Sequence, residues 1–239
     1  MNTLLVFATD KERAAAVGAL GCPAAEIPGG LTFWPHGGRN FLALTAGIGP
    51  AASALRLGAA LARTIDLAGC VNLGVAGTFD PETAPIGSVV AATGETWPEF
   101  GLRSGEDVDP AGLRLPQMTT PRGPVRDRLA LDPKGAAQAM GIALPAGTVF
   151  GESLTVAGVT ATAKGAAAMR ERYGALTENM EGFSLALGCE EAGLPFLELR
   201  IVSNIVGSRD KKDWDLAGAL ASLEGLFTSL TAPISPAPQ

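Results

Sequence analysis

Short apolar runs alternate along the chain with alanine-rich stretches of helical period, and this alternation constrains the fold most. The clearest apolar runs are 4–9, 41–46, 67–75, 87–93 and 194–204. Strands that alternate with helices are typical of α/β proteins with a largely parallel sheet. The chain has 239 residues, of which 47% are hydrophobic, enough to bury a sizeable core. The sequence therefore predicts a single α/β domain over residues 1–239, with a mixed, mostly parallel central sheet flanked by helices.

One long segment interrupts this alternation. Over residues 95–135, proline, glycine and charged residues crowd together without a clear period. Long irregular segments inside compact domains are usually functional or disordered. We therefore expect residues 95–135 to form a long excursion over the surface.

The charge balance narrows the class of ligand. The formal net charge is −6, the sequence pI is about 4.9, and no basic run is visible. Nucleic acid is therefore not an expected partner, and a small neutral or zwitterionic ligand fits better. No apolar run is long enough to span a bilayer, so no membrane partner is expected. The opening LLVFA is too short for a secretory core and lacks a basic leader, which makes the cytoplasm the expected location.

Cysteine and histidine usage gives no sign of a metal centre. Cys22, Cys70 and Cys189 are scattered and odd in number, so we expect reduced, buried thiols. His36 is the only histidine, and the segment 33–38 reads as a strand that ends in a turn. We therefore predict no bound metal and no histidine-based catalytic triad.

A glycine-rich turn resembles a dinucleotide-binding fingerprint. The stretch 47–52 satisfies G-x-G-x-x-A, and Asp66 lies about 20 residues on. In that fingerprint, however, the acid closes the following strand, whereas Asp66 precedes the run 67–75. We therefore predict no dinucleotide cofactor, and no other cofactor. The glycines more plausibly let a backbone turn approach an anion, a water or a substrate.

Polar or tight-turn residues stand at several predicted strand ends and helix starts, where ligands of α/β proteins usually bind. They occur at 9–12, 47–49, 72–78, 178–181 and 203–204. We read 178–181 as the opening of a helix. Simpler readings are that Glu181 only favours the dipole of a helix first turn, and that Glu12 is a surface residue in such a turn.

Four stretches carry a family resemblance. AGIGPAASA, NLGVAGTF, ENMEGFSLA and PFLELRIVSN, in that order, resemble the purine nucleoside phosphorylase and nucleosidase superfamily, in particular its methylthioadenosine nucleosidase branch. The resemblance covers most of the chain and matches least over 95–150. It implies a nucleoside substrate, water as the second reactant, and a homodimer or larger homo-oligomer. In such an assembly, residues 95–135 would cover the site of the neighbouring subunit.

The resemblance assigns two acids. Glu12 corresponds to the family's acid that positions the nucleophilic water. This role is chemically sensible, because a carboxylate can orient water and stabilise an oxocarbenium-like transition state. Met180 and Glu181 correspond to the ribose-binding pair, with Glu181 holding the 2′ and 3′ hydroxyls. Asn179 stands where the methylthioadenosine branch has a second acid.

Two further segments are assigned by the same resemblance. Residues beside the ribose and base are Val75, Ala76 and Gly77. Val75 replaces the serine that is usual in the branch, so a hydroxyl contact is lost and backbone contacts remain. The base-lining segment falls on 153–156, which includes Leu154 and Thr155.

Asn204, which follows Ser203, indicates which base leaves. Adenine-specific relatives carry aspartate at this position, whereas the 6-oxopurine phosphorylases use asparagine. The amide can donate to N7 or O6 of a purine, while a carboxylate facing O6 leaves an acceptor unpaired at about 1–3 kcal/mol. Asn204 therefore favours hypoxanthine or guanine as the leaving base.

The positions of the cationic residues indicate whether water or phosphate is the second reactant, and which residues could contact the 5′ end of the substrate. Phosphate-using relatives cluster arginines, and no such cluster appears here, which favours hydrolysis. An anionic group on a 5′ substituent could meet any of five residues: Arg103, Arg200, Arg209, Lys211 and Lys212. Three alternatives stay open: a 6-oxopurine phosphorylase, a methylthioadenosine nucleosidase, and a nucleoside-binding protein without turnover.

Overall fold

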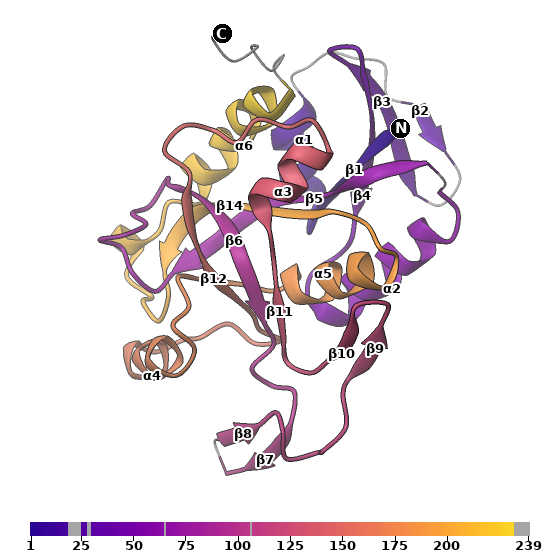
Figure 1. Cartoon of the computed structure of the whole chain (residues 1–239). Coiled ribbons are helices and arrows are strands. Elements are labelled where there is room, and N and C mark those ends of the chain that lie inside the picture. Colours follow the sequence, from indigo (N-terminus) through magenta and orange to yellow (C-terminus); the bar gives the residue numbers. More distant parts are fainter. Residues whose placement is uncertain (19–24, 28–29, 65, 106, 232–239) are drawn as a thin grey trace, which may run out of the picture.

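The computed structural model of the chain describes residues 1–18, 25–27, 30–64, 66–105 and 107–231 (Figure 1). Its strands are β1 Asn2–Phe7, β2 Ala25–Ile27, β3 Leu31–His36, β4 Arg39–Thr45, β5 Leu67–Thr78, β6 Val89–Thr96, β7 Leu102–Ser104, β8 Asp107–Asp109, β9 Met118–Thr120, β10 Gly123–Val125, β11 Arg128–Ala130, β12 Val149–Thr155, β13 Thr177–Asn179 and β14 Phe196–Ile205. Its helices are α1 Asp10–Val17, α2 Pro50–Leu61, α3 Pro133–Ala139, α4 Ala163–Tyr173, α5 Gly182–Glu191 and α6 Leu216–Thr231, with a short 3-10 turn, η2, at Lys211–Asp213.

The predicted α/β domain with a mixed sheet is confirmed. Parallel pairs join β1 to β4 and β5, β5 to β14, and β12 to β6 and β13. Antiparallel pairs are as frequent, since they join β2 to β3, β3 to β4, β13 to β5, and β6 to both β11 and β14. The sheet is therefore less parallel than the sequence implied, because the meander β2–β3–β4 and the strands around β6 and β13 pair antiparallel.

Strand β14 closes part of the sheet into a ring. It pairs with β5 on one side and with β6 on the other, while β6, β12, β13 and β5 follow one another in the sheet. The strands β1, β4, β3 and β2 extend from β5 as an open wing (Figure 1). The interior of so small a ring holds only side chains, as in other narrow barrels.

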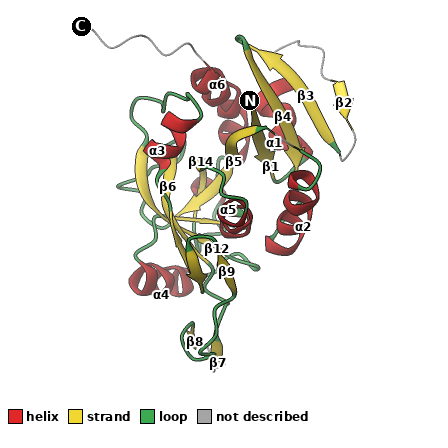
Figure 2. Ribbon diagram, turned by 45° about the vertical axis from the view of Figure 1, so that its right-hand side comes forward, coloured by secondary structure: helices red, strands yellow, loops and turns green. Residues whose placement is uncertain are grey.

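Helices cover both faces of the wing, as the alternation along β1 requires (Figure 2). Leu5 and Phe7 belong to a core that α1, α3 and α6 complete. Leu4 and Val6 point to the other face, where α2 and α5 lie. Successive residues of one strand thus anchor opposite helix layers, and the buried first strand fixes where α1 begins.

The segment 95–135 is more regular than its composition indicated. It carries two hairpins, β7–β8 and β9–β10, before β11 returns to pair with β6. The β7–β8 hairpin projects from the body of the molecule (Figures 1 and 2). Each of these strands has only three residues, too few to show a hydrophobic period in the sequence. The location of the segment 95–135 at a subunit interface stays a prediction.

The expectation of reduced, buried cysteines is confirmed for the cysteines that the structure describes. Cys70 and Cys189 are buried and not joined by a disulfide, whereas Cys22 lies outside the described residues. Strand β3 ends at His36 and turns through Gly37 and Gly38, both with positive φ. Across the described ranges, no helix is long and apolar enough to cross a membrane.

Candidate active site

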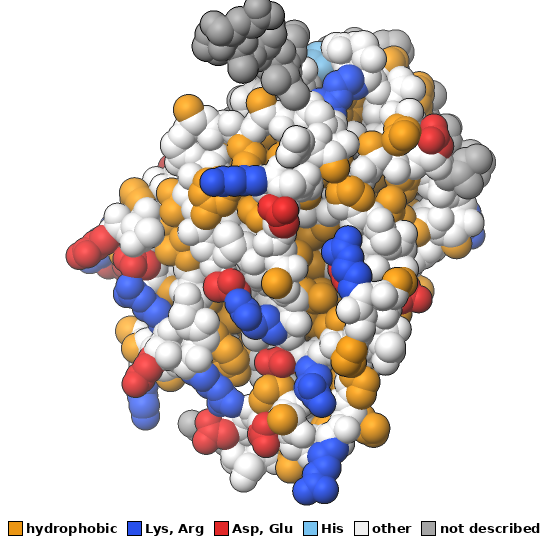
Figure 3. Space-filling view, in the orientation of Figure 1, with side chains coloured by type: hydrophobic (Ala, Val, Ile, Leu, Met, Phe, Trp, Pro, Cys, Tyr) orange, Lys and Arg blue, Asp and Glu red, His pale blue; other side chains and the backbone are white. Residues whose placement is uncertain are grey.

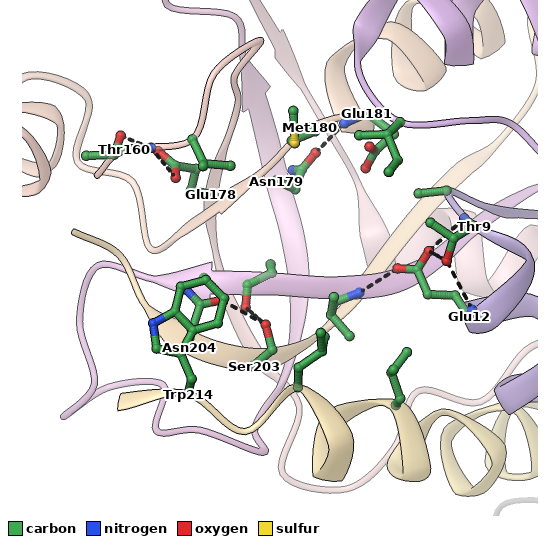
Figure 4. A pocket seen from close by; sticks show the side chains of 18 of the residues that line it. Thr9, Glu12, Thr160, Glu178, Asn179, Met180, Glu181, Ser203, Asn204 and Trp214 are labelled. Carbon is green, nitrogen blue, oxygen red and sulfur yellow. Dashed lines mark hydrogen bonds between the residues drawn. The ribbon is translucent and has the colours of Figure 1, made fainter. Parts of the chain in front are cut away.

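A cavity of about 320 Å³ opens at the carboxyl ends of β1, β5 and β14, next to the starts of α1 and α5 (Figure 4). Its walls combine the predicted residues of these strand ends with side chains that were not predicted. They are Ala8, Thr9, Lys11, Glu12, Ile48, Val75, Ala76, Gly77, Val159, Thr160, Glu178, Asn179, Met180, Glu181, Ser203, Asn204, Gly207, Arg209, Trp214, Leu216 and Leu220.

Glu12 is held by the turn between β1 and α1. Thr9 caps α1, and the two residues form a reciprocal capping box. Glu12 Oε2 accepts hydrogen bonds from Thr9 N and Oγ1, both at 2.9 Å, and Oε1 accepts from Val75 N at 3.2 Å. Only 5% of Glu12 is exposed. A surface acid that merely favours the helix dipole would lie in solvent, so that simpler reading does not describe Glu12.

Glu181 faces the same end of the cavity (Figure 4). Its Oε1 accepts a hydrogen bond from Gly49 N at 3.1 Å, and its Oε2 lies 3.7 Å from Arg200 Nη1. Burial raises the pKa of Glu181, and the nearby Arg200 opposes this rise. Gly49 has a φ of 89°, a conformation that favours glycine. The glycine-rich turn therefore serves to bring a backbone N–H to a carboxylate.

The glycine-rich turn at 47–49 and Asp66 lie far apart, so they do not form a dinucleotide-binding fingerprint. Gly47 and Gly49 follow the carboxyl end of β4, whereas Asp66 directly precedes β5. Both strands run parallel to β1, so the two segments lie at opposite edges of the sheet. Asp66 instead lies 3.5 Å from the N-terminal ammonium group.

The helix after Asn179 begins later than the sequence indicated. Residues Thr177–Asn179 form β13, Glu181 occupies the N-cap position, and α5 starts at Gly182. The reason is Asn179, whose Oδ1 accepts hydrogen bonds from Glu181 N at 2.9 Å and from Gly182 N at 2.8 Å. Asn179 thus satisfies two donors of the helix start and fixes the turn that carries Glu181.

Arg200 does not reach the substrate side of the pocket as a 5′ contact, which corrects one of the five candidates. It is 1% exposed and does not line the cavity. Its Nε donates to Glu198 Oε1 at 2.8 Å, and its guanidinium pKa is raised by Glu198 and Glu181 despite the opposing effect of burial. Because β14 is buried on both faces, a cation in its middle must pair inside the protein.

Leu154 and Thr155 also lie elsewhere than expected. Both are buried on β12, and neither lines the cavity. Thr155 Oγ1 lies 2.7 Å from Glu95 Oε2 and accepts from Phe183 N at 2.7 Å, so it supports the ring interior rather than a ligand. The wall at this place is made by Val159 and Thr160, a few residues further on.

Asn204 closes the opposite end of the cavity from Glu12 (Figure 4). The register of β14 against β5 shifts between Val202 and Asn204, and such a bulge re-aims the side chain that follows it. Ser203 Oγ lies 2.8 Å from Asn204 Oδ1, to which its hydroxyl can donate. Among the described residues, Asn204 Nδ2 has no hydrogen-bond partner. The amide therefore presents a free donor.

The absence of a side chain at Gly77 leaves room for Asn204 Nδ2. A Cβ atom at Gly77 would lie 2.9 Å from Asn204 Nδ2 and 2.7 Å from Val206 Cγ2. Val75 and Ala76 line the cavity beside it, and Val75 N is the group that binds Glu12. The backbone N–H of Val75 is thus used within the protein, and its contact with a ligand stays a prediction.

Sequence reasoning assigned no role to several residues of the wall, although it singled out the stretch 178–181. Glu178 accepts a hydrogen bond from Thr160 N at 3.0 Å, and burial raises its pKa. Trp214, with Nε1 donating to Ser208 O at 2.9 Å, lines the cavity near Asn204. The Glu178 that precedes Asn179 offered a signal, because an acid at the end of a buried strand seldom stands there for packing alone. Trp214 reaches the cavity only through the loop after β14.

Two cations line the cavity, Lys11 and Arg209. Both are exposed. Within the part of the chain that the structure describes, no group of three or more His, Cys, Asp or Glu is arranged to hold a metal ion.

Comparison with known proteins shows the family to which the chain belongs. The family model of the phosphorylase superfamily matches residues 4–227, and the chain belongs to this superfamily. A futalosine hydrolase of Streptomyces coelicolor is 39% identical over 98% of this chain and 96% of its own length. A futalosine hydrolase of Thermus thermophilus is 32% identical over 82% of this chain and 83% of its own length. The structure of a futalosine hydrolase mutant of Helicobacter pylori matches with a TM-score of 0.71 at 17% identity, covering 95% of this chain and 96% of that one, and so confirms the fold.

Proposed function

We propose that the chain hydrolyses the N-glycosidic bond of futalosine, releasing hypoxanthine and dehypoxanthine futalosine in menaquinone biosynthesis. The similarity to two curated futalosine hydrolases over most of the chain supports this proposal. The observation that carries it is the arrangement of the cavity, with two buried carboxylates at one end and an uncharged amide donor at the other.

The carboxylate end suits cleavage through a cationic sugar. As the glycosidic bond breaks, positive charge develops on the ribose ring. Glu12 orients the attacking water and takes its proton, and Glu181 binds the 2′ and 3′ hydroxyls. Both carboxylates are fixed by backbone N–H groups, so little reorganisation is needed when the charge appears. Met180 offers an apolar surface to the sugar.

The amide end suits a 6-oxopurine. The free Nδ2 of Asn204 donates to N7 or O6 of hypoxanthine, and Ser203 keeps Oδ1 turned away. Water rather than phosphate is the second reactant, because Arg13 is held by Asp10 at 3.1 Å and Arg56 is exposed with its Nη1 3.5 Å from Thr45 O. Futalosine carries a carboxylate on its 5′ substituent, and Lys11 or Arg209 meets it.

The decisive experiment follows base release from futalosine, inosine and methylthioadenosine, each with and without phosphate. We expect phosphate-independent release of hypoxanthine from futalosine and slower or no release from the other two. Faster cleavage of methylthioadenosine, or strict dependence on phosphate, would assign the chain to another activity of the superfamily. No release from any nucleoside that nevertheless binds would identify a binding protein.

The same proposal includes a homodimer or larger homo-oligomer. An apolar groove of about 580 Å³ lies between α2 and α5, lined by Ala54, Leu61, Phe183 and Leu187 among others, with Trp97 and Met118 of the excursion beside it. Figure 3 shows hydrophobic side chains exposed at the centre of this face of the molecule. A second copy packed on this groove would bury it, and its segment 95–135 would lie over the neighbouring active site. Sedimentation of the full chain tests this, and a monomer at micromolar concentration would refute it.

A further inference from the structure

A cluster of charged side chains fills the interior of the strand ring, behind the wall of the cavity. Glu95 comes from β6, Asn179 from β13, and Glu198 and Arg200 from β14. Both carboxylates are 0% exposed. The proposed reaction makes no direct use of Glu95 or Glu198, so their burial needs another explanation.

The cluster holds more carboxylates than cations. Glu198 pairs with Arg200 at 2.8 Å, which accounts for one negative charge. Glu95 has no ion-pair partner among the described residues, and the charged groups that face it are Glu198 and, beyond it, Arg200, both from β14. The groups that reach it from the other packed strands, Thr155 and Asn179, are neutral. Burial and the charge of Glu198 both raise the pKa of Glu95.

The hydrogen bonds of the cluster leave both a carboxylate oxygen, Glu198 Oε2, and a donor, Arg200 Nη2, without a partner among the described residues. Asn179 Nδ2 lies 2.6 Å from Glu95 Oε1, 2.9 Å from Ser153 Oγ and 3.1 Å from Glu198 Oε1, so its two hydrogens face three acceptors. Glu198 Oε2 is buried without any donor in the described part of the chain. A Cβ at Gly182 would lie 2.3 Å from Glu95 Oε1 and 2.5 Å from Glu198 Oε2, so the two oxygens approach the same point. A protonated Glu95 supplies the absent donor.

We propose that Glu95 and Glu198 share one proton and act together as a positioning pair for the active site. The pair then carries a single negative charge beside Arg200, which also faces Glu181. Neither residue touches the substrate. The proposal deepens the proposed hydrolase function and rests on it for its catalytic consequence.

Two connections carry the effect of the pair to the cavity. Through Arg200, it fixes the group whose Nη1 faces Glu181 at 3.7 Å. A Cβ at Gly74 would lie 2.6 Å from Arg200 Nη1 and 2.7 Å from Glu12 Oε1, so the guanidinium and the water-activating acid converge above this glycine. Through Asn179, the pair holds the residue that caps the turn of Glu181. Loss of the shared proton places two adjacent negative charges in the ring, which displaces Asn179 and Arg200.

The activity test compares pH profiles for futalosine hydrolysis. Glu95→Gln keeps the shape and the neutral charge, so we expect kcat near the wild-type value at neutral pH and no loss on the alkaline side. Wild type loses kcat there as the shared proton dissociates. Glu198→Gln removes the carboxylate oxygen to which Arg200 Nε donates. The guanidinium is then misplaced, so kcat falls at every pH with less change in KM, since a misplacement of about 1 Å costs on the order of 100-fold. Glu152→Gln, which alters an acid paired with Arg128 outside the cluster, is the control and keeps the wild-type profile. An alkaline limb that is unchanged in Glu95→Gln overturns the proposal.

Infrared spectroscopy tests the pair without any substrate. At pH 8, wild type shows the carbonyl stretch of a protonated carboxylic acid. Glu95→Gln removes it, and Glu198→Gln also removes it because Glu95 then ionises beside Arg200. If neither variant changes this region, both acids are ionised and the proposal fails. If the two spectra change as expected but wild type cleaves no nucleoside, the proposed function fails and the proton-sharing pair stands.

Discussion

The two ends of the cavity differ in charge. At the sugar end, Glu12 and Glu181 are buried carboxylates, and Arg200 lies behind them. At the base end, Ser203 and Asn204 are uncharged, and the acid on that side of the cavity, Glu178, accepts a hydrogen bond from Thr160 (Figure 4). Burying a charge is costly unless it is paired, and the two carboxylates at the sugar end are bound by backbone N–H groups at the place where the reaction develops a positive charge.

The difference teaches how one cavity can separate rate from specificity. Charges at the sugar end strengthen their interaction as the bond breaks, which accelerates the reaction. A neutral donor at the base end distinguishes bases by pairing or failing to pair with O6. Variants at the two ends should therefore change different kinetic quantities.

The largest expected effect comes from Glu12→Gln. The amide keeps the shape of Glu12 but cannot take a proton from water, so kcat for futalosine should fall by about 10²–10⁴-fold while nucleoside binding survives. Steady-state kinetics and calorimetric binding measure the two quantities. Asp10→Asn, in the same helix turn but with 77% of its side chain exposed, serves as the control. A rate for Glu12→Gln close to that of the control would remove Glu12 from the mechanism.

Glu181→Gln should lower kcat and raise KM together, by about 10²-fold in kcat/KM, because the ribose contact exists before the reaction and tightens during it. A 2′,3′-dideoxy analogue of the substrate should show a similar loss with the wild-type enzyme. If the analogue is cleaved as well as the parent nucleoside, Glu181 does not bind the ribose hydroxyls.

At the base end, Asn204→Asp should change specificity more than rate. Exchange of a donor for an acceptor opposite O6 costs about 1–3 kcal/mol, which corresponds to roughly 5- to 150-fold in discrimination. The quantity to measure is the ratio of kcat/KM for futalosine to that for its 6-amino analogue. We expect this ratio to fall by at least about fivefold, and a ratio that stays constant would make Asn204 a strand-end cap without a role in base choice.

The smallest effect is expected from Arg209→Ala. An exposed ion pair contributes about 0.2–1 kcal/mol, so KM for futalosine should rise by up to about fivefold with kcat unchanged. Inosine, which lacks the 5′ carboxylate, should show no change. Lys212→Ala, whose Nζ lies 3.2 Å from Asp210 and which does not line the cavity, is the matched control. An equal rise in KM for inosine would show that Arg209 acts on the shape of the loop.

Stability adds a test of the ring interior. A carboxyl whose folded pKa is raised contributes less stability as pH rises from its unfolded value towards its folded one. Burial raises the pKa of Glu95, so the melting temperature of Glu95→Gln relative to wild type should increase from pH 4 to pH 8. Thermal unfolding at several pH values measures this difference. A difference that is independent of pH would mean that Glu95 is ionised at pH 8.

The sequence by itself determined the class of fold and the strand-end residues of the cavity. Local patterns suffice for these, because a buried strand, its cap at Thr9 and the polar residues that follow it lie within one short stretch. Glu12, Glu181 and Asn204 were found in this way, and the structure brings all three to one cavity.

Only the tertiary structure decided which charged groups face the cavity and which support it from behind. Arg200 looked like a candidate for the 5′ substituent, and Thr155 like a wall of the base site, yet both point into the ring that β14 closes. That ring depends on pairing between strands far apart in the chain, with Glu95 and Glu198 separated by more than 100 positions. A polar side chain on a buried strand contacts ligand or protein depending on which strand lies opposite it. That strand is distant in the chain, so the local hydrophobic pattern does not predict the contact.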